Sequence, residues 1–308
     1  MITFGTDPEF MLKDSRDHLK SAIGVVPGTK EQRYDLGGQA AMYYDNVLCE
    51  LQIKASESKN EAVDNIRYAL TKAAAIVKPL RLVTQASASY PKAELNHHDA
   101  LKFGCDPEFC AYEMRVIDPP DAAEGVFRSG GGHIHIGFNG GADIEDDDPD
   151  KVEELNLKVM MDRLWIARIA DLIIGVPSLF LDKDPTSKDR RKLYGGAGSH
   201  RSCPKYGVEY RSLSNFWLSR PSLVELMFDL ANVTHDIVMV DKAHEDIWEN
   251  KLNPQTLQST INKWDMAEAK ELMKVTQSFL PAKVKKALAK EIEKPWSNDI
   301  YTQWGIKI

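Results

Sequence analysis

Three short segments of the sequence each place two chemically reactive side chains two positions apart. The pairs are Asp7 with Glu9, His133 with His135, and Glu209 with Arg211. Because residues two apart on a β-strand point to the same face, each pair would present both side chains on one side of a sheet. Polar pairs on a half-buried sheet face are costly unless a metal, a ligand or an opposite charge satisfies them. The spacing therefore indicates a binding site.

The residue types indicate what such a site would bind. Carboxylates and imidazoles together coordinate a divalent metal, with Mg²⁺ preferring the oxygens and Mn²⁺ accepting both. Glu50 adds a carboxylate on another predicted strand, and the glycines at 130–132 allow a backbone or ligand to approach closely. The guanidinium of Arg211 suits a phosphate or carboxylate, because it binds with two parallel hydrogen bonds. Metal ligands and an arginine beside glycines point to phosphoryl transfer.

Each signal also has an ordinary structural explanation. A single His-x-His is more often structural than metal-binding, and a single Glu-x-Arg is usually a cross-strand ion pair. The glycine stretch at 195–198, between Arg190, Arg191 and Arg201, could close over phosphates or could be an ordinary surface loop, and it matches no phosphate-binding fingerprint. The combination of several such pairs at period two nevertheless favours a site.

One seven-residue string occurs twice. Residues 4–10 recur at 103–109 with six of seven positions identical. Either a β unit is duplicated, or the same acidic turn into a strand is used twice at one site. Asp106 and Glu108 repeat the first acidic pair, so the sequence leaves open which copy would bind a metal.

The expected elements place strands before helices. Strands are expected at 2–12, 41–54, 82–89, 103–116, 131–139 and 206–215. Helices are expected at 58–78, at 149–174 with an end at Gly175, at 221–248, and between the prolines 254, 281 and 295. Since strands and helices do not alternate, we predict an α+β fold, with an antiparallel sheet and helices packed on one side.

Composition limits the class of protein. The 308 residues are 43% hydrophobic and 28% charged, with a net charge of −7, so we expect a globular chain without a nucleic-acid partner. No apolar run reaches the roughly 18 residues of a membrane span, and no signal peptide is expected. The four cysteines form no C-x-x-C pair, which predicts core thiols in a reducing, cytoplasmic protein. The acidic run at 143–150 is interpreted as a solvated loop and helix start.

In combination, these motifs resemble the carboxylate–amine ligases, or amidoligases, of glutamine-synthetase-like fold, in particular the branch common in tailed phages. The motifs are the Gly-x-Asp-Pro-Glu-Phe strings, Asp45-Asn46-Val47 with Glu50, the Gly-Gly-His-Ile-His-Ile-Gly stretch at 131–137, and residues 209–217. The resemblance covers about residues 4–217, and no motif is recognised after 220. It implies a curved antiparallel sheet in a catalytic core at 1–220, with a helical region at 221–308 packed on it as one domain.

The resemblance also implies roles for individual residues. The implied metal ligands are Asp7, Glu9, Glu50, Glu108, His133 and Glu209. The implied nucleotide or phosphate contacts are His135, Arg211, Arg128, Arg190 and Arg191. The implied catalytic residues are Glu9, Arg211 and Arg201. Among these, Glu9 would hold the metal facing the transferred phosphoryl group, and Arg211 would steady the γ-phosphate.

The implied reaction uses ATP with Mg²⁺ or Mn²⁺. A carboxylate of a small molecule or peptide would attack the γ-phosphorus, and an amine would then displace phosphate from the acyl phosphate to form an amide. Because an acyl phosphate must be kept from water, we expect segment 183–205 to close over the site. The location would be the host cytoplasm if the gene belongs to a phage. The substrates and the oligomeric state stay open.

Two other functions compete with this one. A metal-dependent hydrolase or oxygenase would use the His-x-His and a distant glutamate without ATP, and would not need Arg211. A non-catalytic binding protein would keep the fold without turnover. Nucleotide dependence separates the first two functions, and turnover separates both from the third.

Overall fold

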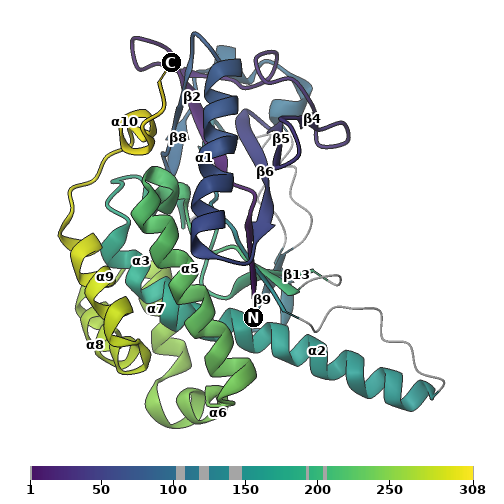
Figure 1. Cartoon of the computed structure of the whole chain (residues 1–308), viewed down its shortest axis with the longest axis vertical. Helices are drawn as coiled ribbons and strands as arrows, with labels where there is room; N and C mark the ends of the chain where they lie inside the picture. The colour runs from purple at the N-terminus through teal and green to yellow at the C-terminus, as the bar shows by residue number, and fades with distance from the viewer. Residues whose placement is uncertain are drawn as a thin grey trace.

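The computed structural model describes residues 2–101, 108–117, 125–138, 148–191, 194–203 and 207–307. Within these ranges a twelve-stranded antiparallel sheet is combined with helices on its sides and beyond one end (Figure 1). The α+β class with a large antiparallel sheet is therefore confirmed.

The strands are short, and most of them join one sheet. They are β1 (Thr3–Thr6), β2 (Glu9–Lys13), β3 (Leu19–Lys20), β4 (Tyr34–Asp35), β5 (Ala40–Asp45), β6 (Leu48–Ser56), β7 (Arg81–Val83), β8 (Ser87–Ser89), β9 (Glu108–Cys110), β10 (Arg115–Ile117), β11 (Phe127–Ser129), β12 (Ile134–Gly137), β13 (Ser199–Cys203) and β14 (Gly207–Tyr210). The main path runs β10-β9-β13-β14-β12-β1-β6-β2-β3, while β4, β5 and β7 branch from it and β8 pairs with β11 in a separate sheet.

The predicted first strand is split into β1 and β2 at Asp7-Pro8. Proline has no backbone N–H for the ladder, so a strand is easily interrupted there. Both halves pair with β6, through Thr6 opposite Ile53 and Glu9 opposite Glu50. The break therefore leaves β1 and β2 as consecutive segments beside one long strand.

The predicted strand at 41–54 is instead the hairpin β5–β6. Asn46 takes a left-handed conformation with φ of 53° in the turn, and Asp45 pairs with Leu48 across it. Asparagine tolerates this conformation better than most residues, which explains the turn. Strands β3, β4, β11 and β13 were not expected. The strand expected at 82–89 is divided into β7 and β8, and in the described part of 103–116 the strands are β9 and β10.

Ten α-helices lie in the described ranges. They are α1 (Lys59–Ile76), α2 (Pro149–Ala170), α3 (Val176–Leu181), α4 (Ser187–Arg190), α5 (Pro221–His235), α6 (His244–Asp246), α7 (Pro254–Lys263), α8 (Met266–Phe279), α9 (Ala282–Glu293) and α10 (Ile300–Trp304). Ser58 caps α1, because its side chain accepts a hydrogen bond from the Glu61 amide.

The helix expected to end at Gly175 continues to Leu181. A π-helical turn at Asp171–Gly175 joins α2 to α3. An 18-residue window of this Pro149–Leu181 stretch has mean hydropathy 1.8, so by length and composition alone it could cross a membrane, contrary to our expectation. That window is 83% buried inside the protein, as in the core helix of a globular protein. The start of α2 projects from the body (Figure 1).

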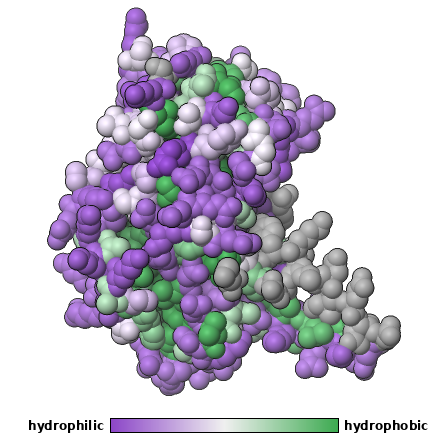
Figure 2. Space-filling model, in the orientation of Figure 1, coloured by the Kyte–Doolittle hydropathy of each residue, from purple (hydrophilic) through white to green (hydrophobic). Residues whose placement is uncertain are grey.

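The two faces of the central sheet have opposite character. Phe4, Ile136 and Val208 point into the main hydrophobic cluster, where the Phe4 ring lies 5.8 Å from that of Trp217 and 5.6 Å from that of Phe228. Side chains from both sides of residue 220 share this cluster, and a boundary at 220 stays a prediction. The outer surface seen in Figure 2 is mainly hydrophilic, with hydrophobic patches over the helical half.

Candidate functional site

Strand register brings the three polar pairs to the same face of the sheet. Gly5 on β1 lies opposite His135 on β12, and His135 lies opposite Glu209 on β14. In two of the pairs the residue between the polar side chains, Ile134 or Tyr210, lies in the main hydrophobic cluster, as the period-two spacing predicted. Pro8, between Asp7 and Glu9, lies instead at the break between β1 and β2. The ligand atoms of Asp7, His135 and Glu209 lie within 4.8 Å of one another, and we name these three residues the central group.

His133 supports the central group from one side. Its Nδ1 lies 3.2 Å from Asp7 Oδ1 and 3.3 Å from Glu209 Oε1, while His135 Nε2 lies 3.1 Å from the same Asp7 oxygen. One carboxylate thus contacts both histidines. The sequence predicted His133 as the ligand and His135 as a nucleotide contact, whereas the geometry places His135 within the trio.

A second cluster, the acidic group, consists of Glu9, Asp45 and Glu50, whose ligand atoms also lie within 4.8 Å of one another. Glu9 and Glu50 face each other across β2 and β6, and the Gly131 amide donates to Glu9 Oε2 at 2.6 Å. Because Asp7 and Glu9 flank Pro8, the break between β1 and β2 supplies one carboxylate to the central group and one to the acidic group.

Sequence reasoning did not select two residues of this region as site residues. Asp45 and Tyr43 lie on β5, and the Tyr43 hydroxyl donates to Glu50 Oε1 at 2.5 Å. Asp45 was quoted only as part of a motif, because 41–54 was interpreted as a single strand rather than a hairpin. The signal for the turn was Asp45-Asn46, a pair typical of turns.

Burial dominates the electrostatics of the carboxyl groups. Burial and the charge of Asp45 raise the pKa of Glu9 to about 7, and burial and the charge of Asp7 raise that of Glu209 to about 7. Burial and three neighbouring carboxyls raise the pKa of Glu50 well above its usual value. These groups favour protonation when no cation accompanies them.

The pKa values of Asp7 and the two histidines depend on their mutual contacts as well as on burial. Burial opposes the charge of Asp7, but His135 and His133 hold its pKa well below the usual value. Burial likewise opposes a charged His135, yet the charge and hydrogen bond of Asp7 raise its pKa overall. Burial and Arg211 lower the pKa of His133 to about 3, which keeps this imidazole neutral.

The donor set fits a divalent cation. The acidic group offers three carboxyls and the central group two carboxyls and an imidazole, which are the ligands of Mg²⁺ and Mn²⁺. In the described part of the chain, His133 Nε2 is buried without a hydrogen-bond partner. The space beside it leaves no room for a larger residue than glycine at position 131, because a Cβ there would lie 2.5 Å from this nitrogen.

Arg211 is held between two carboxylates, one of which belongs to the central group. It forms ion pairs with Glu209 and, at 3.1 Å, with Glu108 Oε2, and its side chain is 2% exposed. Arg201 lies at the rim, with its guanidinium 3.3 Å from Glu209 Oε2. Both predicted catalytic arginines therefore contact the same carboxylate of the central group.

Three other arginines that were predicted to bind phosphate instead make hydrogen bonds that are mostly to backbone carbonyl oxygens. Arg190 is buried and donates to the carbonyl oxygens of Gly130, Arg211 and Ser212. The guanidinium of Arg191 lies 5.2 Å from the Trp264 ring and donates to Gly195 and Ser178. Arg128 donates to Asn46 and to the carbonyls of Ala100, Gly125 and Phe127 beside the small sheet. The structure does not bring Arg128 into the central or acidic group.

The second acidic string has a different environment from the first. Residues 103–107, including Asp106, lie outside the described residues. Glu108 belongs to β9, accepts from Ser199 Oγ at 3.3 Å and pairs with Arg211. Glu9, by contrast, lies in the acidic group, so the first copy is the one whose described residue joins a cluster that could hold a metal ion.

The predicted lid lies against the site. Tyr194 packs its ring 6.2 Å from that of His133, and the Arg211 guanidinium lies 5.3 Å from it. The part at 199–203 is strand β13, and residues 192–193 and 204–206 are outside the described residues. A closing motion stays a prediction.

A cavity of about 540 Å³ opens beside the central group. Asp7 and His135 of the central group line it, as does Tyr43. Arg33 and Lys54 also line it. The cavity thus adjoins two residues of the central group and carries two basic side chains on its lining.

Comparison with known proteins adds one match. Residues 156–302 match the family model described as phage phiEco32-like COOH.NH2 ligase-type 2. No curated protein matches the chain. The match includes Glu209, Arg211 and the helices after 220, where we recognised no motif, but not the segments of Asp7, Glu9 or His135. The match therefore extends past residue 217, beyond the motifs, and does not test the motifs before residue 156. The resemblance itself is confirmed: over residues 156–302 this chain carries the sequence signature of the phage-type carboxylate–amine ligases.

Proposed function

We propose that this protein is an ATP-dependent carboxylate–amine ligase of glutamine-synthetase-like fold, which works through an acyl phosphate with Mg²⁺ or Mn²⁺. One observation carries the proposal: the central and acidic groups lie next to each other on one sheet face, and an open cavity adjoins them. The family match supports the ligase class.

The two groups would hold divalent ions. Glu9, Asp45 and Glu50 offer only oxygens, which suits Mg²⁺, while His135 in the central group makes Mn²⁺ equally acceptable. Bound ions would neutralise phosphate charge and orient the reacting oxygens. His133 would hold Asp7 and Glu209 in place through Nδ1.

The cavity would take the nucleotide. Asp7 and His135 of the central group line this cavity, so phosphates bound beside them would reach the ions. The Arg33 guanidinium lies 5.3 Å from the Tyr43 ring and donates to Gln52 Oε1 at 2.8 Å, and all three residues line the cavity. Lys54 adds a second cation on β6.

Arg211 and Arg201 would act on the transferred phosphoryl group. Glu209 and Glu108 orient Arg211, so the guanidinium needs no reorganisation when charge develops. The substrate carboxylate oxygen would bond to the γ-phosphorus as ADP leaves. The amine nitrogen would then bond to the acyl carbon, lose a proton and release inorganic phosphate. Tyr194 and the surrounding segment would exclude water from this step.

Thermal unfolding tests the proposal without named substrates. Mg²⁺ or Mn²⁺ is added with and without ATP to wild type, His135→Ala, Glu209→Gln and the exposed control His18→Ala. A ligand at 100 times its dissociation constant stabilises a fold by about 2.7 kcal/mol, which is readily visible. We expect ATP to stabilise wild type and His18→Ala only when metal is present, and the two site variants to lose this effect while remaining folded.

The opposite results are equally informative. If metal alone stabilises the protein and ATP adds nothing, the nucleotide-dependent function is wrong and a metal-dependent hydrolase or oxygenase takes its place. If ATP binds with metal, pools of acids and amines are then screened for ADP release. ADP release that requires both an acid and an amine would establish the ligase reaction.

A further inference from the structure

We propose that His97, His98 and Asp99 form a binding site for a divalent transition metal, with Zn²⁺ as its ion. We name these residues the surface group. The site is separate in residues and chemistry from the central and acidic groups, and it does not depend on the proposed ligase activity.

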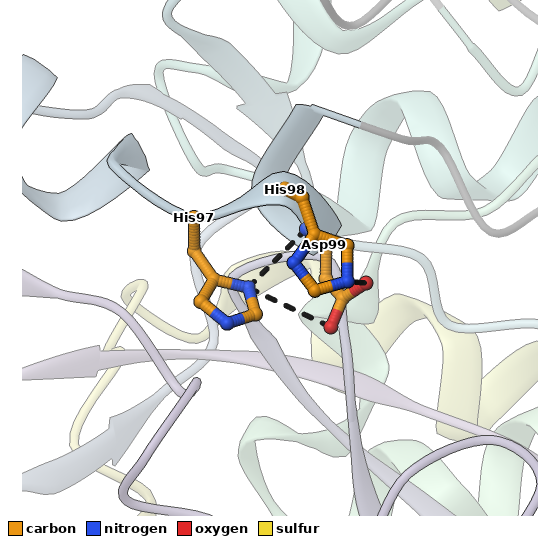
Figure 3. A group of neighbouring side chains, drawn as sticks. All are labelled: His97, His98 and Asp99. Carbon is orange, nitrogen blue, oxygen red and sulfur yellow. Dashed lines mark hydrogen bonds and ion pairs between the residues drawn. The ribbon is translucent and has the colours of Figure 1, made fainter.

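The three side chains converge on one point (Figure 3). His98 Nε2 lies 2.9 Å from Asp99 Oδ1 and His97 Nδ1 lies 3.6 Å from Asp99 Oδ2, and all three ligand atoms lie within 4.8 Å of one another. The imidazole rings lie beside each other, with centroids 4.5 Å apart and an angle of 33° between their planes. Small movements would bring two nitrogens and an oxygen to the distances of about 2.0–2.2 Å found in zinc sites.

Two buried side chains hold the backbone carbonyl of Ala100, the residue that follows the surface group. The Asn46 side-chain amide donates to the Ala100 carbonyl at 2.9 Å, and an Arg128 guanidinium nitrogen donates to the same oxygen at 2.7 Å. The Tyr44 hydroxyl donates to Asp99 Oδ2 at 3.0 Å and thereby orients the carboxylate. Such outer contacts are a regular feature of metal sites, because they fix the ligands before the ion arrives.

Both histidines can turn a ring nitrogen toward an ion. The Asp99 amide donates to His97 Nδ1 at 3.2 Å, and an ion bound at this nitrogen would take the place of that hydrogen bond. His98 Nε2 faces the Asp99 carboxylate at 2.9 Å. The side chains of His97 and His98 are 41% and 72% exposed, which leaves room for water as the remaining ligand.

The ligand types distinguish this site from the other two. Two imidazoles with one carboxylate favour Zn²⁺ and similar transition metals, whereas sites made largely of carboxylates favour Mg²⁺ and Mn²⁺. Millimolar Mg²⁺ would therefore compete poorly at the surface group. This difference allows the sites to be measured separately.

The surface group is attached to the turn that carries Asp45 of the acidic group. Tyr44 and Asn46, on either side of Asp45, make the contacts to Asp99 and Ala100. An ion at the surface group would therefore tie residues 97–99 more firmly to the β5–β6 turn. We expect Zn²⁺ to slow amide hydrogen exchange in residues 44–47.

Zinc stoichiometry tests the assignment. Zn²⁺ is titrated by calorimetry into the full chain in the presence of excess Mg²⁺, for wild type, His97→Gln, His98→Gln and His18→Gln. His18 is a matched control, because it is an exposed histidine beside Asp14, 3.4 Å away, without a second histidine in the pair. Circular dichroism confirms that each variant is folded.

We expect His97→Gln and His98→Gln each to lose one equivalent of bound Zn²⁺, or to bind it at least tenfold more weakly, while His18→Gln behaves as wild type. Any Zn²⁺ bound at the central group contributes equally to all four proteins. Unchanged Zn²⁺ binding in both variants, an absence of Zn²⁺ binding in wild type, or an equal loss in His18→Gln would each overturn the assignment.

Discussion

Removing the Tyr43 hydroxyl tests whether the acidic group binds a metal ion. In Tyr43→Phe the ring stays beneath the Arg33 guanidinium, and only the hydrogen bond to Glu50 Oε1 is lost. Both side chains are buried, at 4% and 7% exposed, so water cannot replace the hydroxyl without rearrangement. The variant therefore isolates one contact to one proposed ligand.

The size of the effect depends on the charge of Glu50. Burial raises the pKa of Glu50 well above its usual value, which favours the neutral carboxyl when no metal is bound. A hydrogen bond between neutral groups contributes about 0.5–1.5 kcal/mol, and one to a charged group about 1.5–3 kcal/mol. An ion would ionise Glu50, so the hydroxyl should stabilise the metal-bound state by about 1.4 kcal/mol more than the metal-free state. That difference corresponds to roughly tenfold weaker ion binding.

The assay is Mn²⁺ or Mg²⁺ binding by calorimetry without nucleotide. Tyr44→Phe is the matched control, because Tyr44 is the next residue on β5 and its hydroxyl donates to Asp99 instead. We expect Tyr43→Phe to bind the ion about tenfold more weakly and Tyr44→Phe to bind it as wild type does. Unchanged affinity in Tyr43→Phe, or an equal loss in Tyr44→Phe, would refute the role of Glu50 as a ligand.

Three further predictions concern pH, a buried arginine and a glycine. Burial raises the pKa of Glu9 from 4.5 to about 7, so between these pH values the folded metal-free protein retains a proton that the unfolded chain loses. As the pH rises from 4.5 to about 7, the free energy of unfolding of wild type should therefore fall relative to that of Glu9→Gln. The slope, measured by urea unfolding, should reach about 1.4 kcal/mol per pH unit. Arg190→Lys should lower the free energy of unfolding by about 2–4 kcal/mol, because buried carbonyls lose their donors, whereas Arg201→Lys at the rim should change it by less than about 0.5 kcal/mol. Gly132→Ala should cost about 1–3 kcal/mol in chemical denaturation, because its Cβ would lie 2.5 Å from a backbone carbonyl oxygen, while Gly125→Ala, with 3.9 Å to its nearest neighbour, should be close to neutral.

The period-two spacing alone predicted which side chains would share a face. This inference is robust because strand alternation is a local property, and β1, β12 and β14 obey it. Which strands become neighbours is not local. The α+β class followed from the order of elements, but strand β13 lay within a segment that was interpreted as a loop.

The distinction between the arginines could not be made from the sequence. Arg190 and Arg211 both lie near glycines and acids, but Arg190 donates to three backbone carbonyls and Arg211 to two carboxylates. Hydrogen bonds between residues far apart in the chain decide this difference. Asp45 was missed for a related reason, since a single left-handed residue, Asn46, converts a predicted strand into a hairpin.

The order of the strands has a consequence for folding kinetics. Asp7 and Glu209 meet in the central group although about two hundred residues separate them, and β1 is joined to β14 only through β12. Contacts between such distant segments close large loops and form slowly, so local helices such as α8 and α9 should appear earlier. Ion binding should therefore develop only in the slowest phase of refolding. A metal-sensitive signal would then report the arrival of the native topology, and no fragment limited to residues 156–302 would display it.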